Sequence, residues 1–251
     1  MQTLAGGALW NWVRNDMALE RIAAGTGAIL YEPSRLDHPT PADFDPAALG
    51  AAGRITGTAT GRGSAWFVAP RAGAATVLRH YRRGGLIARL VADRYLWRGE
   101  EATRAFRELR LLAALEALGL PAARPVAARY RRSGLLYRAD LITLAIPGAR
   151  SLADRLADPS VPWARIGATL RAFHEAGVCH ADLNARNVLI DEKGGVHLID
   201  FDRGTLAAPG RWRERNLERL RRSLVKIGGR RPEGWTALLD GYRTPRSAPR
   251  R

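Results

Sequence analysis

Two short stretches decide the fold of this chain, His180-Ala181-Asp182-Leu183-Asn184-Ala185-Arg186-Asn187 and Ile199-Asp200-Phe201-Asp202. The first places a carboxylate and an amide five residues apart, and the second adds a carboxylate after a short predicted hairpin. This set suits phosphoryl transfer, in which one Asp accepts a proton from the attacking hydroxyl while the amide and the other carboxylate hold Mg²⁺. The alternative is that both aspartates are turn residues and that His180 is a buried core histidine.

The second half of the chain predicts mainly helices around these stretches. Pro162 stands in the first turn of a helix that ends at Gly177, and residues 188–190 and 196–199 form a hairpin. Residues 212–227 predict a basic helix with its apolar side formed by Leu217, Leu220, Leu224 and Ile227. The basic residues from 243 to 251 predict a disordered tail.

The first half predicts mainly strands. Ile55–Val68 reads as strand, glycine-rich turn and strand, and Ala75–Tyr81 reads as a third strand. Residues 100–118 predict a long helix, and residues 135–146 are extended. Four prolines between residues 33 and 46 predict an irregular connector. We therefore expect an N-terminal extension and connector at 1–52, a strand-rich lobe at 53–145 and a helical lobe at 146–242.

The charge of the chain is strongly positive and carried by arginine. Its 251 residues include 40 basic and 24 acidic side chains, a formal charge of +16, yet Lys193 and Lys226 are the only lysines. At 46% hydrophobic and 25% charged residues, complete disorder is excluded, and so is any function that needs a lysine before residue 193. The single cysteine excludes an internal disulfide. A basic nucleic-acid-binding protein is the non-enzyme alternative, but the chain lacks a recognisable nucleic-acid motif, so no nucleic-acid partner is expected.

The block from the helix before His180 to Asp202 resembles the catalytic loop and metal-binding motif of the protein-kinase-like superfamily. Within it, the chain is most similar to the bacterial lipopolysaccharide core kinases over about residues 55–230. Besides the block itself, the similarity is carried by Gly61-Arg62-Gly63, Val77–Leu86, Gly119-Leu120-Pro121 and Ile146-Pro147-Gly148. The resemblance implies an α+β, bilobal kinase-like fold with a small antiparallel-sheet N-lobe, one long helix and a compact, mainly helical C-lobe.

The resemblance also implies roles for the residues of the two stretches. Asp182 would be the catalytic base, and Asn187 and Asp200 would hold Mg²⁺. Arg186 would reach the transferred phosphate, and His180 would support the loop from behind.

The nucleotide side of the site is expected in the first half. Gly57, Gly61, Arg62 and Gly63 lie in the strand–turn–strand, where backbone amides could approach ATP phosphates, although a plain hairpin would look similar. Arg79 stands where kinases place their nucleotide-binding lysine, and this replacement belongs to the resemblance. Glu108 on the long helix is its expected partner; the alternative is a solvated surface pair.

The resemblance implies ATP-dependent phosphorylation of a hydroxyl, the 4-hydroxyl, of 3-deoxy-D-manno-octulosonic acid (Kdo) on a lipid A precursor. A heptose or other small-molecule kinase is the alternative. The short remainder after Asp200 has no room for peptide-binding helices, so no protein substrate is expected. The enzyme would be peripheral at the cytoplasmic face of a Gram-negative inner membrane, without a transmembrane helix. Arginines at 129–132 and 211–222 would bind this anionic surface, or they are solvated faces.

Overall fold

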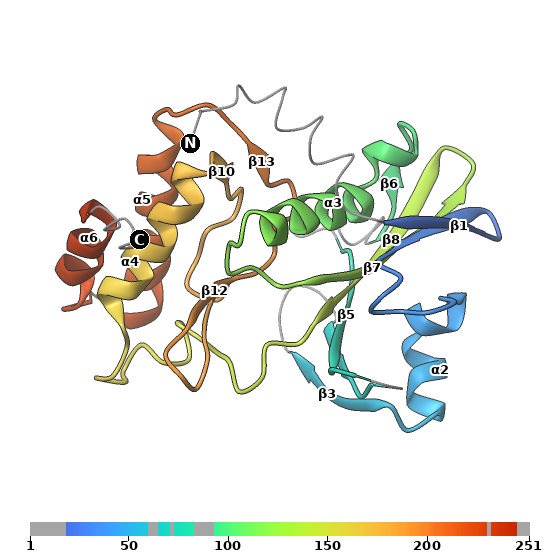
Figure 1. Cartoon of the computed structure of the whole chain (residues 1–251), viewed down its shortest axis with the longest axis horizontal. Coiled ribbons are helices and arrows are strands. Elements are labelled where there is room, and N and C mark those ends of the chain that lie inside the picture. Colours follow the sequence, from blue (N-terminus) through green and yellow to red (C-terminus); the bar gives the residue numbers. More distant parts are fainter. Residues whose placement is uncertain (1–18, 60–64, 71–72, 83–92, 230–231, 245–251) are drawn as a thin grey trace, which may run out of the picture. The chain divides into compact units, whose positions relative to one another are not determined.

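The computed structural model of the chain describes residues 19–59, 65–70, 73–82, 93–229 and 232–244 (Figure 1). These residues form two compact units. The N-terminal unit consists of the described residues up to Ala114 together with Ala123–Ala145, and the C-terminal unit of Leu115–Ala122 and the described residues from Ile146 onwards. Helices and antiparallel sheets together confirm the predicted α+β class.

An antiparallel sheet of eight strands forms the centre of the N-terminal unit. Its strands are β1 (Glu20–Ala24), β2 (Gly27–Tyr31), β3 (Ile55–Ala59), β4 (Ala65–Val68), β5 (Thr76–His80), β6 (Tyr95–Leu96), β7 (Pro125–Ser133) and β8 (Leu136–Leu144). They pair in the order β1-β2-β7-β8-β5-β4-β3, and β6 pairs with β8. The predicted strands at residues 55–68, 75–81 and 135–146 are confirmed as β3, β4, β5 and β8.

Helical segments cover both faces of this sheet. Helix α3 (Arg104–Ala117), preceded by the 3-10 turn η3 (Glu100–Ala102), packs the ring of Phe106 edge-on against Tyr130, with 5.3 Å between centroids. The 3-10 turn η1 (Pro41–Phe44) and helix α2 (Pro46–Ala51) cover the opposite face with an apolar cluster that includes Phe44 and Leu49. Strand β7 is therefore buried from residue 125 to residue 130 on both of its sides.

The segment before residue 55 differs from the predicted connector. Residues 20–31 form the β1–β2 hairpin, and β2 joins the sheet by pairing with β7. Pro41 and Pro46 each begin a short helix, a position where the missing amide proton and fixed φ of proline are tolerated. The prolines indicated irregular backbone because their effect at a helix start depends on neighbours that the pattern does not show.

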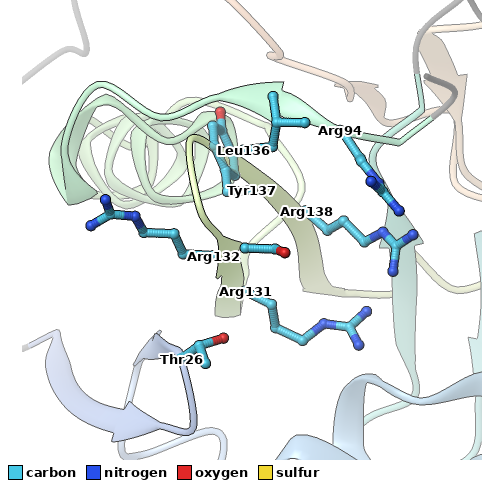
Figure 2. Close-up of a pocket in the computed structure, with 8 residues that line it drawn as sticks. Thr26, Arg94, Arg131, Arg132, Leu136, Tyr137 and Arg138 are labelled. Atoms are coloured by element: carbon cyan, nitrogen blue, oxygen red, sulfur yellow. The ribbon is translucent and has the colours of Figure 1, made fainter.

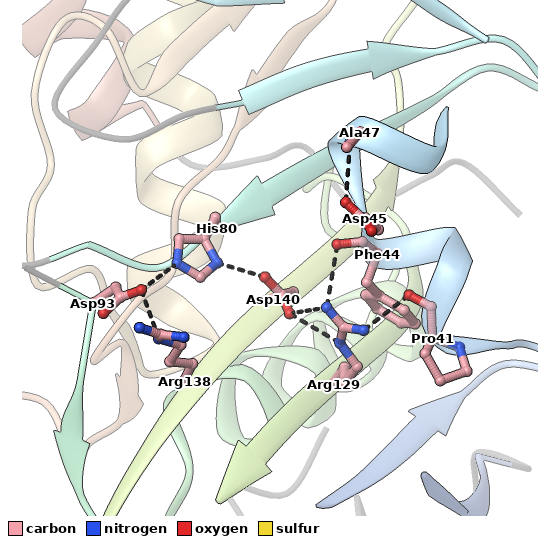
Figure 3. Close-up of polar contacts among 9 residues, drawn as sticks. All are labelled: Pro41, Phe44, Asp45, Ala47, His80, Asp93, Arg129, Arg138 and Asp140. Atoms are coloured by element: carbon pink, nitrogen blue, oxygen red, sulfur yellow. Dashed lines mark hydrogen bonds and ion pairs between the residues drawn. The ribbon is translucent and has the colours of Figure 1, made fainter. Parts of the chain in front are cut away.

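A buried polar network joins the three neighbouring strands β7, β8 and β5 (Figure 3). Arg129 on β7 donates from Nε and Nη2 to Asp140 Oδ2 at 3.0 and 2.9 Å, and Asp140 Oδ1 lies 2.6 Å from His80 Nδ1 on β5. Arg129 also donates to the carbonyls of Pro41 and Phe44 and is 4% exposed. The expectation that Arg129 belongs to a membrane-facing cluster is therefore wrong: its charge is satisfied inside the unit.

The C-terminal unit is built mainly from helices α4 (Trp163–Glu175), α5 (Trp212–Gly228) and α6 (Trp235–Arg243). Small strands connect them, namely β9 (Arg150–Ser151), β10 (Val178–Cys179), β11 (Val188–Ile190), β12 (Val196–Leu198) and β13 (Thr205–Leu206). The predicted helix after Pro162, the hairpin β11–β12 and helix α5 are confirmed. Helix α6 was missed; it packs on α4 so closely that a Cβ on Gly167 or Gly241 would collide with the facing backbone.

The buried side of α5 differs from the predicted one. Trp212, Asn216, Leu220 and Leu224 are buried at intervals of four residues, while Ile227 is 41% exposed. A polar residue, Asn216, thus takes a place on the inner face of the helix. Among the described residues, no helix has the length and apolar character needed to cross a bilayer.

Candidate active site

His180 organises the loop that follows β10. The backbone amide of Asp182 donates to His180 Nδ1 at 3.1 Å, so Nδ1 is an acceptor and the proton lies on Nε2, which donates to the carbonyl of Ile199 at 2.9 Å. Burial lowers the pKa of His180 and favours this neutral form. One buried imidazole therefore connects the loop that carries Asp182 to the segment that carries Asp200.

Asn187 and Asp200 are held near each other by the backbone. The amide of Ile199 donates to the carbonyl of Asn187 at 3.1 Å, so Asp200 follows directly after a residue that pairs with Asn187. Asp200 has a φ of 63°, in the left-handed region that residues other than glycine rarely adopt. The next side chain, Phe201, is buried against Phe173 of α4 and the His180 ring, at centroid distances of 5.7 and 4.7 Å. This packing stabilises the unusual backbone at Asp200.

Asp182 points its carboxylate toward α5. Both Nε and Nη2 of Arg219 donate to a single oxygen, Oδ1, and the Nε contact measures 2.8 Å. Within the described residues no donor reaches the other oxygen, Oδ2. The pair is accessible, with 42% of the Asp182 side chain exposed. One oxygen is therefore oriented by the protein, and the other is available to a hydroxyl group.

One face of α5 holds the loop in place. Asn216 accepts from the amide of His180 at 3.2 Å and donates to its carbonyl at 3.1 Å, and Ser223 accepts from the amide of Ala185 at 3.1 Å. Together with Arg219 these residues stand three and four positions apart, so they share one side of the helix. Sequence reasoning missed all three. The available signal was a neutral amide inside a helix of charged and apolar residues, which is an unfavourable place for Asn unless its side chain has partners.

The side chains of residues 184–187 close the loop. Asn184 and Asn187 both donate to the carbonyl of Asp182, at 3.0 and 2.9 Å. The backbone amide of Arg186 donates to Asn184 at 2.9 Å, and the Arg186 side chain is exposed. The structure therefore brings His180, Asp182, Asn187 and Asp200 together on the framework that their spacing predicted.

The predicted pair of the N-terminal unit is confirmed: Arg79 on β5 donates to Glu108 Oε2 on α3. Tyr81 donates its hydroxyl to the same oxygen at 2.5 Å, and the Arg79 guanidinium stacks 4.8 Å from the centre of the Tyr81 ring. Glu108 is 3% exposed, so the alternative of a solvated surface pair is wrong.

The predicted glycine-rich turn is only partly described. Gly57 lies in β3 at an irregularity of its pairing with β4. Gly61, Arg62 and Gly63 lie outside the described residues.

Residues 47–242 match the model of the lipopolysaccharide kinase (Kdo/WaaP) family. The chain belongs to this family. It is 50% identical over 214 residues to 3-deoxy-D-manno-octulosonic acid kinase of Stenotrophomonas maltophilia strain K279a, which covers 84% of this chain and 85% of that protein. It is 48% identical over 218 residues to 3-deoxy-D-manno-octulosonic acid kinase of Xanthomonas euvesicatoria pv. vesicatoria strain 85-10, covering 86% and 87% of the two chains.

Asn187 and Asp200 carry side-chain oxygen atoms of the kind that Mg²⁺ binds. Asn187 uses its amide nitrogen for the carbonyl of Asp182, which leaves Oδ1 without a donor among the described residues although the residue is 8% exposed. Carboxylate and amide oxygens are hard donors, and Mg²⁺ commonly takes only one or two protein ligands beside phosphates and water. Asn187 and Asp200 are therefore the residues that would hold the ion.

A basic cavity of about 330 Å³ lies in the N-terminal unit of this family member, beside the β7–β8 hairpin (Figure 2). Its wall contains the four arginines Arg94, Arg131, Arg132 and Arg138. Arg138 pairs with Asp93 at 2.7 Å, and the Arg132 guanidinium stacks 5.0 Å from the centre of the Trp97 ring. The cavity concentrates positive charge at a site where the sequence had indicated only a cluster of arginines.

Proposed function

We propose that this chain is an ATP-dependent kinase that phosphorylates a hydroxyl group of Kdo carried on a lipid A precursor. The observation that carries the proposal is the identity of 47–50% with kinases named for 3-deoxy-D-manno-octulosonic acid, across at least 84% of the chain. The arrangement around Asp182 supports it, because an oriented carboxylate with one accessible oxygen is what a hydroxyl acceptor requires.

In the proposed reaction, Asp182 Oδ2 takes the proton of the acceptor hydroxyl. The acceptor oxygen then forms a bond to the γ-phosphorus of ATP, the bond from that phosphorus to the β–γ bridging oxygen breaks, and ADP leaves with the electron pair. Mg²⁺, held by Asn187 and Asp200, would neutralise negative charge on the phosphates. Arg186, whose side chain is exposed beside Asn187, would contact the transferred phosphate.

Arg79 would bind ATP phosphate in place of the lysine that many kinases use. Its pairing with buried Glu108 holds the guanidinium in one position, and the planar guanidinium is a strong donor to phosphate oxygens. Gly57, Gly61, Arg62 and Gly63 would complete the nucleotide site through their backbone amides.

The acceptor would be reached at the cytoplasmic face of the inner membrane, where we propose that the enzyme binds as a peripheral protein. The cavity beside the β7–β8 hairpin supports this proposal, because guanidinium groups bind lipid phosphates bidentately. Arg131 and Arg132 line that cavity, so the double variant R131Q/R132Q should sediment less with vesicles that contain anionic lipid. Equal sedimentation of this variant and the wild type would exclude the cavity as the membrane contact.

The decisive experiment incubates the protein with Mg²⁺-ATP and a Kdo–lipid A precursor, then locates the added phosphate by mass spectrometry and fragmentation. We expect one phosphate on the 4-hydroxyl of Kdo. Free Kdo and a heptosylated acceptor, tested in parallel, separate this activity from that of a heptose or other small-molecule kinase. Phosphate on heptose alone, or no transfer to any of the three acceptors, would overturn the proposal.

A further inference from the structure

A second basic cavity, of about 360 Å³, lies within the C-terminal unit. Three of its lining residues directly precede Asp182 in the sequence. Residues 179–181 form one wall, and α5 forms the other with Arg215, Arg219 and Arg222. These arginines stand four and three positions apart and therefore share one side of the helix. The cavity thus adjoins the proposed base and presents three guanidinium groups.

The positive charge of this cavity exceeds its negative charge. Glu218 is the acidic residue of its wall, and Arg221 occupies both carboxylate oxygens of Glu218 at 2.8 Å from outside the wall. Arg222 approaches Glu218 only to 3.9 Å. Within the described part of the chain, no carboxylate pairs with Arg215. Neighbouring guanidinium groups repel one another, so such a set is relieved by an anion that binds between them.

Arg219 joins this cavity to the proposed base. Only Nε and Nη2 donate to Asp182, and both donate to the same oxygen. A guanidinium has five donor hydrogens, so Nη1 and part of Nη2 remain for a second acceptor. Arg219 can therefore bind a carboxylate in the cavity without releasing Asp182.

We infer that this second basic cavity, between residues 179–181 and α5, is the binding site for the carboxylate of an acidic sugar acceptor. Arg215 and Arg222 bind this carboxylate, and Arg219 bridges it to Asp182, so the recognised anion and the proposed base contact the same side chain. This inference rests on the proposed function, and it adds what selects the acceptor: a carboxylate attached to the sugar that is phosphorylated. The forked geometry of arginine suits a planar carboxylate, which it can bind through two parallel hydrogen bonds.

The first test separates acceptor binding from turnover with single substitutions on α5. We expect R215Q to raise the KM for the Kdo acceptor about tenfold, the size of one lost charged hydrogen bond, with a much smaller change in kcat. R219Q should raise the same KM and also lower kcat, because it releases Asp182. The KM for ATP should not change in either variant. K226Q is the matched control, since Lys226 is an exposed cation of the same helix and does not belong to the cavity wall.

The second test needs no turnover. Cys179 is the only cysteine of the chain and lines the cavity, so the rate at which iodoacetamide alkylates it reports whether the cavity is filled. Free Kdo should slow alkylation of the wild type and of K226Q, whereas the carboxamide of Kdo should not. In R215Q and R219Q, free Kdo should give little protection.

The two tests distinguish failure of this inference from failure of the proposed function. Phosphorylation of Kdo together with unchanged acceptor KM in R215Q and R219Q would overturn the carboxylate site alone. Equal protection by Kdo and its carboxamide would also overturn it. Selective protection by Kdo without any phosphate transfer would support the cavity as a carboxylate site and contradict the kinase proposal.

Discussion

Two pairs of arginine and carboxylate, one in each unit, have the same chemistry and opposite surroundings. Glu108 is 2% exposed at its side chain and has Tyr81 as a second donor, while its partner Arg79 is 23% exposed. Asp182 and Arg219 are 42% and 47% exposed, and Asp182 keeps one oxygen without a donor among the described residues. Burial thus makes Glu108 part of the core, whereas exposure leaves the carboxylate of Asp182 accessible to a substrate.

The difference has an energetic origin. A buried carboxylate loses its hydration, so removing its cationic partner leaves an uncompensated charge that costs several kcal/mol. An exposed carboxylate keeps its water, and its ion pair contributes only about 0–1 kcal/mol. A catalytic base must exchange partners during turnover, and the weakly held pair is the one that permits this.

The largest effect is expected at the exposed carboxylate, and it should be an effect on rate. D182N removes the proposed proton acceptor, so we expect kcat to fall by about 10²–10⁴-fold while the free energy of unfolding changes by about 1 kcal/mol or less. Steady-state transfer of phosphate from ATP and urea denaturation measure the two quantities. D240N is the control, because Asp240 is an exposed carboxylate of the same unit. Near-normal turnover of D182N would mean that Asp182 is not the base.

The next effect is expected at the buried pair, and it should be an effect on stability. R79M removes the cationic partner of buried Glu108, so we expect a loss of about 3 kcal/mol in the free energy of unfolding. R219Q should cost about 1 kcal/mol or less, because its partner stays hydrated. Urea denaturation of both variants makes the comparison directly. Equal destabilisation would show that burial does not separate the two pairs.

The smallest effect concerns a buried group that stays neutral. Burial lowers the pKa of His174 to about 4, whereas an exposed histidine titrates near 6.5. Between these values the unfolded chain binds a proton that the folded chain does not, so stability should fall by at most about 3 kcal/mol as the pH decreases from about 6.5 to about 4.

The variant H174F tests whether His174 causes this pH dependence. His174 stacks edge-on with Trp212 and Tyr242, at centroid distances of 5.0 and 5.5 Å, so a phenylalanine ring keeps much of the packing. We expect chemical denaturation of H174F to show a shallower dependence on pH. An unchanged slope would assign the effect to other groups, such as buried His180.

Local spacing was enough to predict the framework of the site. His180, Asp182 and Asn187 belong to one short loop, and the hairpin that brings Asp200 back is a local structure with its own turn residues. The Arg79–Glu108 pair was also predicted, because a resemblance over most of the chain supplied the long-range neighbour. The roles of these residues in catalysis and nucleotide binding stay predictions until the variants are measured.

Contacts between distant segments account for what sequence reasoning missed. Arg219 is 37 residues from Asp182, and Asn216 is 36 residues from His180, so neither partner could be read from spacing. Arg129 looked like one of several surface arginines, yet the pairing of β7 with β8 and the packing of η1 bury it against Asp140. The order and identity of residues establish short loops and turns because those are closed by near neighbours. Which charges lose their water depends on the segments that pack over them, and only the folded chain brings those segments together.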